Sequence, residues 1–131
     1  MSLTQIIHRG RNMYGQRTAL VYGDRTTSYG QLYDEVVRCA AVFAGFDSRP
    51  AARVGILSGN CDRAIIGFFG AMWAGMVPNY LNVRWSLHEL QESIDDFQPS
   101  ILVSDDNFLD RAVALKEACP SIEHILHIGS R

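Results

Sequence analysis

The corner Ser58-Gly59-Asn60-Cys61 is the first place in this 131-residue sequence where residue types and spacing could support chemistry. It follows an apolar run and opens a predicted helix, whose free N–H groups and dipole could bind an anion. The corner lacks the Gly-x-Gly-x-x-Gly spacing of a dinucleotide fingerprint and the Gly-Lys-Ser/Thr ending of a P-loop. Ordinary helix capping by Asn60 is therefore the favoured interpretation, and a phosphate site is the weaker one.

The cysteines offer a second candidate chemistry. Cys61 would have a lowered pKa if it were exposed in the first turn of that helix, but no histidine lies near it in the sequence, so a catalytic thiol is not expected. Cys39 falls on an apolar helix stripe and is expected in the core. Together with Cys119 they make an odd number without paired spacing, which argues against a disulfide framework and favours a reducing, cytoplasmic location.

Acidic and histidine residues form the third candidate, a metal site. Asp105 and Asp106 end a predicted strand, as in the first strand of a response-regulator receiver domain, but too few residues follow to complete that fold. Solvated loop carboxylates are expected there instead. His124 and His127 alternate along a predicted strand and so face opposite ways, and His88 lacks a helical ligand partner. The sequence thus predicts no metal site and no catalytic residue.

These residues must be positioned by strands that alternate with helices. Two capping boxes, Ser28 with Gln31 and Ser86 with Glu89, mark helix starts, and Gly45 is the expected C′ residue of the first of these helices. Asp106 or Asn107 is expected to cap a later one. The predicted elements are a helix over residues 3–13, a hairpin of strands 18–22 and 25–28 around Gly23-Asp24, and strands over 54–57, 78–82, 101–104 and 122–128.

This alternation predicts an α/β fold with a mainly parallel sheet and helices on both faces, preceded by an N-terminal helix and the β-hairpin. Between strands 54–57 and 78–82, the small residues Gly67, Gly70 and Ala71 predict a helix that packs closely against a neighbour. The run 64–83 carries no charge and is long enough to cross a bilayer. Gly75 and Pro78 interrupt it, so a buried helix followed by a buried strand is predicted, with no membrane span.

Composition sets the class of protein. The chain is 47% hydrophobic and 20% charged, which is typical of a soluble globular domain. Its net charge of −2 and pI near 6.0 give no compositional support for a nucleic-acid or anionic-membrane partner.

Five segments, taken in order, resemble the opening part of the adenylate-forming enzymes, a superfamily that includes acyl-CoA synthetases, luciferases and peptide-synthetase adenylation domains. They are TALV at 18–21, TSYGQL at 27–32, RVGILSGN at 53–60, AGMVPNYLN at 74–82 and LHEL at 87–90. The resemblance covers residues 18 to about 105. One departure is Ala51-Ala52, where the family usually has Gly-Asp; it alters only a predicted surface turn.

The resemblance implies that residues 1–131 form a single partial domain, the N-terminal fragment of an ATP-dependent acid–CoA ligase. Such a parent enzyme, acting for example in fatty acid metabolism, uses ATP, Mg²⁺ and coenzyme A to activate a small carboxylic acid. The family's Ser/Thr/Gly-rich loop ending Pro-Lys-Gly, its Thr-Glu pair, its ribose-binding Asp and its C-terminal Lys do not occur here. The isolated chain is therefore predicted to be inactive and to hold no cofactor, with homodimerisation left open.

One ligand contact remains within the chain. In CoA-forming relatives the loop after the 78–82 strand lies where the CoA nucleotide approaches, so the resemblance implies a CoA-facing role for Asn82, Arg84 and Trp85. A solvated arginine ahead of a helix cap is the simpler interpretation of Arg84. The alternative for the whole chain is a free-standing, non-catalytic α/β module that binds a small ligand or a protein.

Overall fold

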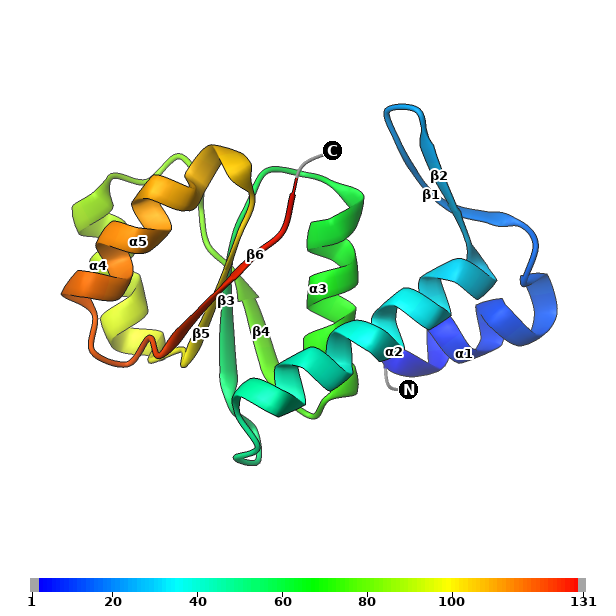
Figure 1. Ribbon diagram of the computed structural model, residues 1–131, viewed down its shortest axis with the longest axis horizontal. Helices are drawn as coiled ribbons and strands as arrows, with labels where there is room; N and C mark the ends of the chain where they lie inside the picture. The colour runs from blue at the N-terminus through cyan, green and yellow to red at the C-terminus, as the bar shows by residue number, and fades with distance from the viewer. Residues whose placement is uncertain (1–2, 130–131) are drawn as a thin grey trace.

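A four-stranded parallel sheet forms the centre of the protein in the computed structural model, which describes residues 3–129 (Figure 1). The strand order is β4-β3-β5-β6, which confirms the predicted parallel α/β architecture. The strands are β3 (Arg53–Leu57), β4 (Val77–Tyr80), β5 (Ile101–Ser104) and β6 (His124–His127). β4 ends two residues before its predicted end, and β6 is shorter at both ends than the predicted 122–128.

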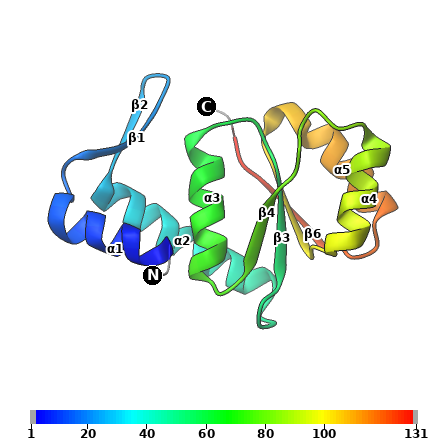
Figure 2. The same ribbon diagram turned by 180° about the vertical axis from the view of Figure 1, so that it is seen from behind.

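Helices cover both faces of the sheet, as predicted (Figures 1 and 2). On one face lie α2 (Tyr29–Phe46) and α3 (Asp62–Trp73), and on the other α4 (Leu87–Phe97) and α5 (Leu109–Ala118). Side chains alternate along the strands, so Ile56 and Val103 pack with α2 and α3, whereas Leu102 packs with α4 and α5. The same alternation separates His124 from His127, as expected.

The N-terminal helix and the hairpin lie beyond α2, at one end of the molecule (Figure 1). They are α1 (Leu3–Tyr14), β1 (Thr18–Tyr22) and β2 (Arg25–Ser28), with Gly23 at φ 58° in the tight turn. Ile7 of α1 packs with Leu32 and Val36 of α2 in a third apolar cluster. Both hairpin strands have the predicted bounds, because the turn dipeptide and the alternating pattern are local signals.

α2 and α3 pack closely because α3 carries glycine at the contact. A Cβ on Gly70 would lie 2.8 Å from Cys39 Cβ and 2.9 Å from its Sγ, so only glycine fits without a shift of the helices. This confirms the close packing predicted from the small residues of α3. The half-buried Cys39 packs against the same core, as expected.

Some helix ends lie where the sequence predicted them, and others do not. Both capping boxes form, Ser28 with Gln31 and Ser86 with Glu89. Gly45 is not the C′ residue: α2 continues through Phe46, whose ring stacks on His124 at 4.9 Å, and Asp47 forms the cap. The helix thus runs past the glycine at which the local signal predicted its end.

Two further caps were assigned to the wrong residues. Cys61, not Asn60, is the N-cap of α3 and makes no side-chain cap bond, while the Asp62 carboxylate accepts from the Arg63 N–H. Asp105 caps a short 3₁₀ helix, Asp106–Phe108, that precedes α5, so neither Asp106 nor Asn107 fills that role. In both cases a carboxylate within two residues of the expected cap accepts a free backbone N–H, Asp62 from Arg63 and Asp105 from Asn107 and Phe108.

The uncharged run 64–83 contains α3 and the edge strand β4, and α3 ends as predicted, with Gly75 at φ 79°. β4 is not the buried strand that was predicted: it pairs only with β3, and Val77 and Tyr80 are each 44% exposed. An edge position, which depends on sheet order, cannot be recognised from an apolar run alone. Among the described residues, no helix is long and apolar enough to span a membrane.

Candidate functional site

The carboxyl ends of β3 and β5 form the place where an open parallel sheet ordinarily binds its ligand. From β3 the chain crosses to β4 on one side and later returns to β5 on the other, so the order reverses between these strands. Ligands of such sheets bind in the crevice outside the strand ends at this reversal. Here that position is bordered by Ser58 and Gly59 after β3 and by Asp105 after β5.

Asp105 closes this crevice with its own side chain. Its Oδ2 accepts hydrogen bonds from the Gly59 N–H at 3.0 Å and the Ser58 hydroxyl at 3.3 Å. Its Oδ1 accepts from the N–H groups of Asn107 and Phe108, each at 3.1 Å. Only 2% of the Asp105 surface is exposed, so its carboxylate is a buried group that links the ends of β3 and β5 by hydrogen bonds. The prediction of a solvated loop carboxylate was therefore wrong for Asp105.

The hydrogen bonds of Asp105 also determine what the corner Ser58–Cys61, which precedes α3, can bind. The Gly59 N–H, which could have served an anion, already donates to Asp105. Cys61 is 5% exposed and contacts the Ser58 hydroxyl at 3.7 Å, so the exposure required for a reactive thiol is missing. The corner therefore has a structural role, but that role is the hydrogen bond to Asp105 and not the capping by Asn60 that the sequence favoured.

The hairpin is tied to α3 by an ion pair that the sequence analysis missed. Arg25 donates from Nε and Nη2 to both Asp62 oxygens, at 2.8 and 2.7 Å, and Asp62 is only 5% exposed. The hydrogen bond from Arg25 outweighs burial and lowers the pKa of Asp62 below its usual range. These residues are 37 positions apart, so no local pattern could have paired them; an acidic residue in the first turn of a helix was the only signal.

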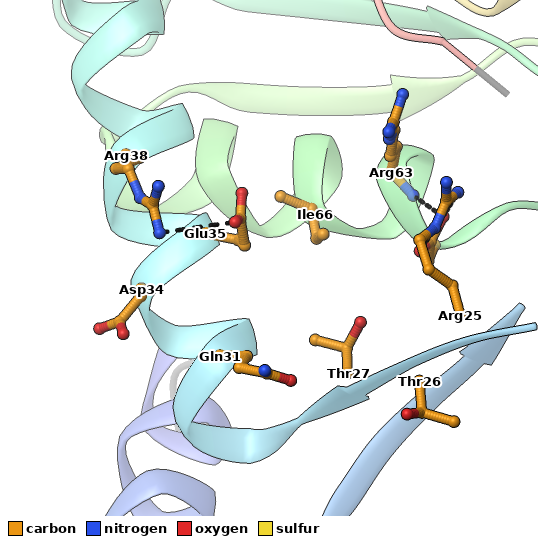
Figure 3. Close-up of a pocket in the computed structure, with 10 residues that line it drawn as sticks. Arg25, Thr26, Thr27, Gln31, Asp34, Glu35, Arg38, Arg63 and Ile66 are labelled. Carbon is orange, nitrogen blue, oxygen red and sulfur yellow. Dashed lines mark hydrogen bonds and ion pairs between the residues drawn. The ribbon is translucent and has the colours of Figure 1, made fainter. Parts of the chain in front are cut away.

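A cleft of about 400 Å³ opens beside this ion pair, between the hairpin, α2 and α3 (Figure 3). Its arginines are already engaged: Arg25 with Asp62, Arg38 with Glu35 at 3.5 Å, and Arg63 with the Gly129 carbonyl at 3.1 Å. Charges of both signs balance here, so the cleft has little attraction for a phosphate. It is lined by Arg25, Thr26, Thr27, Gln31, Asp34, Glu35, Arg38, Asp62, Arg63 and Ile66.

The predicted CoA-facing residues lie together in the turn that follows β4. Asn82 Oδ1 accepts from the Arg84 N–H at 2.9 Å, and the Trp85 N–H donates to the Asn82 carbonyl at 3.1 Å. Arg111 of α5 donates from Nη1 to the Trp85 carbonyl at 2.8 Å and so ties the turn to the next helix. All three predicted residues are exposed. Within residues 3–129 the Arg84 guanidinium has no hydrogen-bond or ion-pair partner.

The histidines are distributed rather than clustered. His88 does have a partner on its own helix, contrary to the sequence expectation, because it pairs with Glu92, four residues on, at 3.0 Å. His124 stacks on Phe46, and His127 lies 2.6 Å from Asp106. Over the described part of the chain, no group of three or more His, Cys, Asp or Glu side chains is arranged to hold a metal. The three cysteines are free thiols.

Comparison with known proteins identifies the family to which this arrangement belongs. The family model described as AMP-binding enzyme matches residues 7–130. The chain is an AMP-binding enzyme family member. This confirms the resemblance to the N-terminal portion of adenylate-forming enzymes that the five sequence segments predicted.

Individual relatives of this AMP-binding family chain are distant in sequence. A luciferin 4-monooxygenase of Luciola mingrelica is 22% identical over 129 residues, which is 95% of this chain and 24% of the relative. A methyl-dioxo-octahydroindenyl propanoyl:CoA ligase of Rhodococcus jostii is 28% identical over 85% of this chain and 22% of the relative. The long-chain-fatty-acid–CoA ligase of Bacillus subtilis is 21% identical, over 88% of the chain and 20% of the relative.

Solved structures show the same fold. An anthranilate CoA ligase in complex with anthranoyl-AMP superimposes with a TM-score of 0.91 at 23% identity, covering 98% of this chain and 25% of that one. The coronafacic acid ligase of Pectobacterium brasiliense superimposes with a TM-score of 0.91 at 20% identity, covering 98% of this chain and 26% of that one. The chain thus spans between a fifth and about a quarter of the length of the relatives and structures named here.

Proposed function

We propose that these residues form the opening part of the large N-terminal domain of an ATP-dependent acid–CoA ligase. The observation that carries the proposal is the family match over residues 7–130 together with a span of 20–24% of the three curated relatives named above. The parent activity is conversion of a small carboxylic acid and ATP to an acyl-adenylate and then to an acyl-CoA. The proposal includes a cytoplasmic location and leaves the identity of the acid, such as a fatty acid, open.

The residues present do not suit ATP with Mg²⁺ on their own. Asp105, the buried carboxylate at the strand ends, already accepts four hydrogen bonds, and the Gly59 N–H is one of its donors. Charge on a nucleotide triphosphate must be neutralised by cations, yet the one lysine of the sequence, Lys116, lies in the last turn of α5. We therefore expect these 131 residues to serve as scaffold and not to adenylate an acid.

Purified chain incubated with ATP, Mg²⁺ and a panel of fatty and aryl acids tests this expectation. Pyrophosphate release should stay at the level of a no-protein blank for every acid. Release that depends on both the acid and the protein would overturn the scaffold assignment.

The turn after β4 is the part of the chain that fits coenzyme A. Arg84 presents an exposed guanidinium, and the Asx-type turn of Asn82 with the Arg111 bond to Trp85 holds the backbone in place. A guanidinium matches the nucleotide phosphates of CoA through paired N–H donors. We assign Arg84 to phosphate binding and Asn82 and Trp85 to shaping the turn.

The Arg84→Ala substitution in the full-length parent tests this assignment. It should raise the KM for CoA by roughly tenfold, the loss of one charge-assisted contact, while acid-dependent pyrophosphate release is unchanged. Lys116→Ala, which removes another exposed cation of the same sign, is the matched control and should leave both quantities unchanged. An unaltered KM for CoA in the Arg84 variant would remove the CoA role.

A further inference from the structure

Charge is unevenly distributed along this chain. No Asp or Glu precedes Asp24, whereas Arg9, Arg11 and Arg17 all do. The overall net charge of −2 therefore hides a cationic N-terminal end, which a whole-chain average could not reveal. The structure places Arg9 and Arg11 in α1 and Arg17 in the segment between α1 and β1, at the end of the molecule away from α4 and α5 (Figure 1).

The outward face of α1 is apolar as well as cationic. Ile7 faces inward and is 2% exposed, but Ile6, Met13 and Tyr14 are 48%, 60% and 42% exposed. Ile6 and Met13 are seven residues apart, so they lie on one side of the helix, two turns from each other. A helix of a soluble domain normally places polar residues on this side.

A notch of about 230 Å³ lies within this face. It is lined by Ile6, Arg9, Gly10, Met13, Tyr14 and Tyr29. In its wall the Tyr29 ring packs directly on Gly10, because a Cβ there would lie 2.3 Å from a ring carbon of Tyr29. The Arg17 guanidinium lies 5.1 Å from the centre of the Tyr14 ring, which places a cation beside the aromatic rim of the notch.

We propose that the outward face of α1 binds the surface of anionic lipid bilayers. Exposed aliphatic side chains can enter the acyl boundary, tyrosine favours the headgroup level, and arginine pairs with lipid phosphates; these are the residue types of interfacial helices. Arg9 and Arg17 supply the cations, since Arg11 instead packs over Tyr33 at 4.0 Å and bonds Asn12. A nucleic acid would gain nothing from the apolar stripe. The proposal does not use the ligase activity, but it requires that the remainder of the proposed parent enzyme leaves this face of α1 uncovered.

Sedimentation with lipid vesicles tests the proposal on the purified chain. The probe is phosphatidylcholine vesicles with or without roughly one third phosphatidylserine, which supplies the negative surface potential. The chain should pellet with the anionic vesicles only, and the bound fraction should fall several-fold between about 50 mM and 500 mM salt as the charges are screened.

Substitutions locate the surface. Met13→Asp and Arg9→Glu should each weaken anionic-vesicle binding by about tenfold or more, because one buries a charge in the acyl boundary and the other reverses a phosphate contact. Val113→Asp, at a 45% exposed site on α5, and Lys116→Glu are the matched controls and should bind like the unaltered chain. Circular dichroism verifies that each variant is folded.

Three results would overturn the proposal. They are no pelleting with anionic vesicles, equal pelleting with pure phosphatidylcholine, and equal losses in the α5 controls. Sedimentation equilibrium adds a protein-interface outcome: if Met13→Asp dissociates a dimer of this chain and leaves vesicle binding unchanged, α1 is a self-association surface and the lipid role is refuted.

Discussion

Replacement of Asp105 should reveal how strongly one side chain joins the two halves of the sheet. Its carboxylate links the end of β3, through Gly59 and Ser58, to the first turn after β5, through Asn107 and Phe108. The side chain is almost completely buried. Asp105→Ala would therefore remove a helix cap and a strand-to-strand bridge together, and would leave several N–H groups without acceptors.

The magnitude can be worked from these four bonds. A hydrogen bond to a charged group contributes about 1.5–3 kcal/mol and a helix cap about 1 kcal/mol, but bonds sharing one carboxylate are not additive. Burial of the charge also costs free energy, which the alanine variant recovers. We therefore expect Asp105→Ala to lower the free energy of unfolding by about 3–5 kcal/mol, a large part of the 5–15 kcal/mol typical of a domain.

Asp105→Asn should fall between the unaltered protein and Asp105→Ala. An amide keeps one acceptor oxygen but sets an NH₂ group against the remaining N–H donors, so a loss of about 2 kcal/mol is expected. The assay is urea unfolding followed by far-UV circular dichroism, with the midpoint compared at equal m-value. The control is Asp110→Asn, an exposed carboxylate in the first turn of α5, worth at most about 1 kcal/mol through the helix dipole. If Asp105→Ala lowers the free energy of unfolding no more than this control does, the hydrogen bonds of Asp105 do not stabilise the fold.

Two other substitutions test packing and charge. Gly70→Ala should cost about 1–3 kcal/mol, since its Cβ would lie 2.8 Å from Cys39 Cβ; Gly45→Ala in α2 meets no atom within 4 Å and should be neutral or stabilising by up to about 1 kcal/mol. Equal urea midpoints for the two variants would disprove close α2–α3 packing. Asp47→Asn tests pH dependence: hydrogen bonds from Arg49 and Ser100 hold the pKa of Asp47 well below its usual range. A depressed pKa stabilises the fold above the unfolded-state value of about 3.9, and that stability is lost as pH falls through the folded value. The stability gap between unaltered and Asn proteins, measured by urea unfolding, should therefore be constant from pH 7 to about 5 and narrow below about pH 4; a gap that widens with acid would contradict this reasoning.

Agreement between sequence and structure is best where the determining contacts are local. The capping boxes at Ser28 and Ser86 and the turn at Gly23 each involve residues within three or four positions, so the sequence alone predicts them. Alternation along β6 likewise separates His124 from His127 without knowledge of the neighbours. At Gly45 and Asn60 the local signal did not decide the helix end: α2 runs on to Phe46, which stacks on His124, and near the start of α3 the Asp62 carboxylate accepts from the Arg63 N–H.

The predictions for individual site residues were wrong or incomplete where the deciding contacts join residues far apart in the sequence. Asp105 was assigned to solvent because no sequence pattern shows that β3 and β5 are neighbours, 47 residues apart at the Ser58–Asp105 bond. The Arg25–Asp62 pair and the cleft beside it were missed for the same reason. Charge averaging over the whole chain also hid the cationic face of α1, because an average discards position.

The sequence by itself determined the α/β class, the family and the order of elements, since periodicity, capping and segment order are properties of neighbouring residues. Only the tertiary structure decided that the sheet order places β3 between β4 and β5, which leaves β4 as an exposed edge. That order brings Asp105 next to Gly59. The position at the strand ends where a ligand would ordinarily bind is therefore occupied by the buried Asp105 carboxylate and its hydrogen bonds. Which strands become neighbours depends on how much apolar surface each face of the sheet buries. That quantity depends on residues far apart in the sequence, so a short segment of sequence does not reveal it.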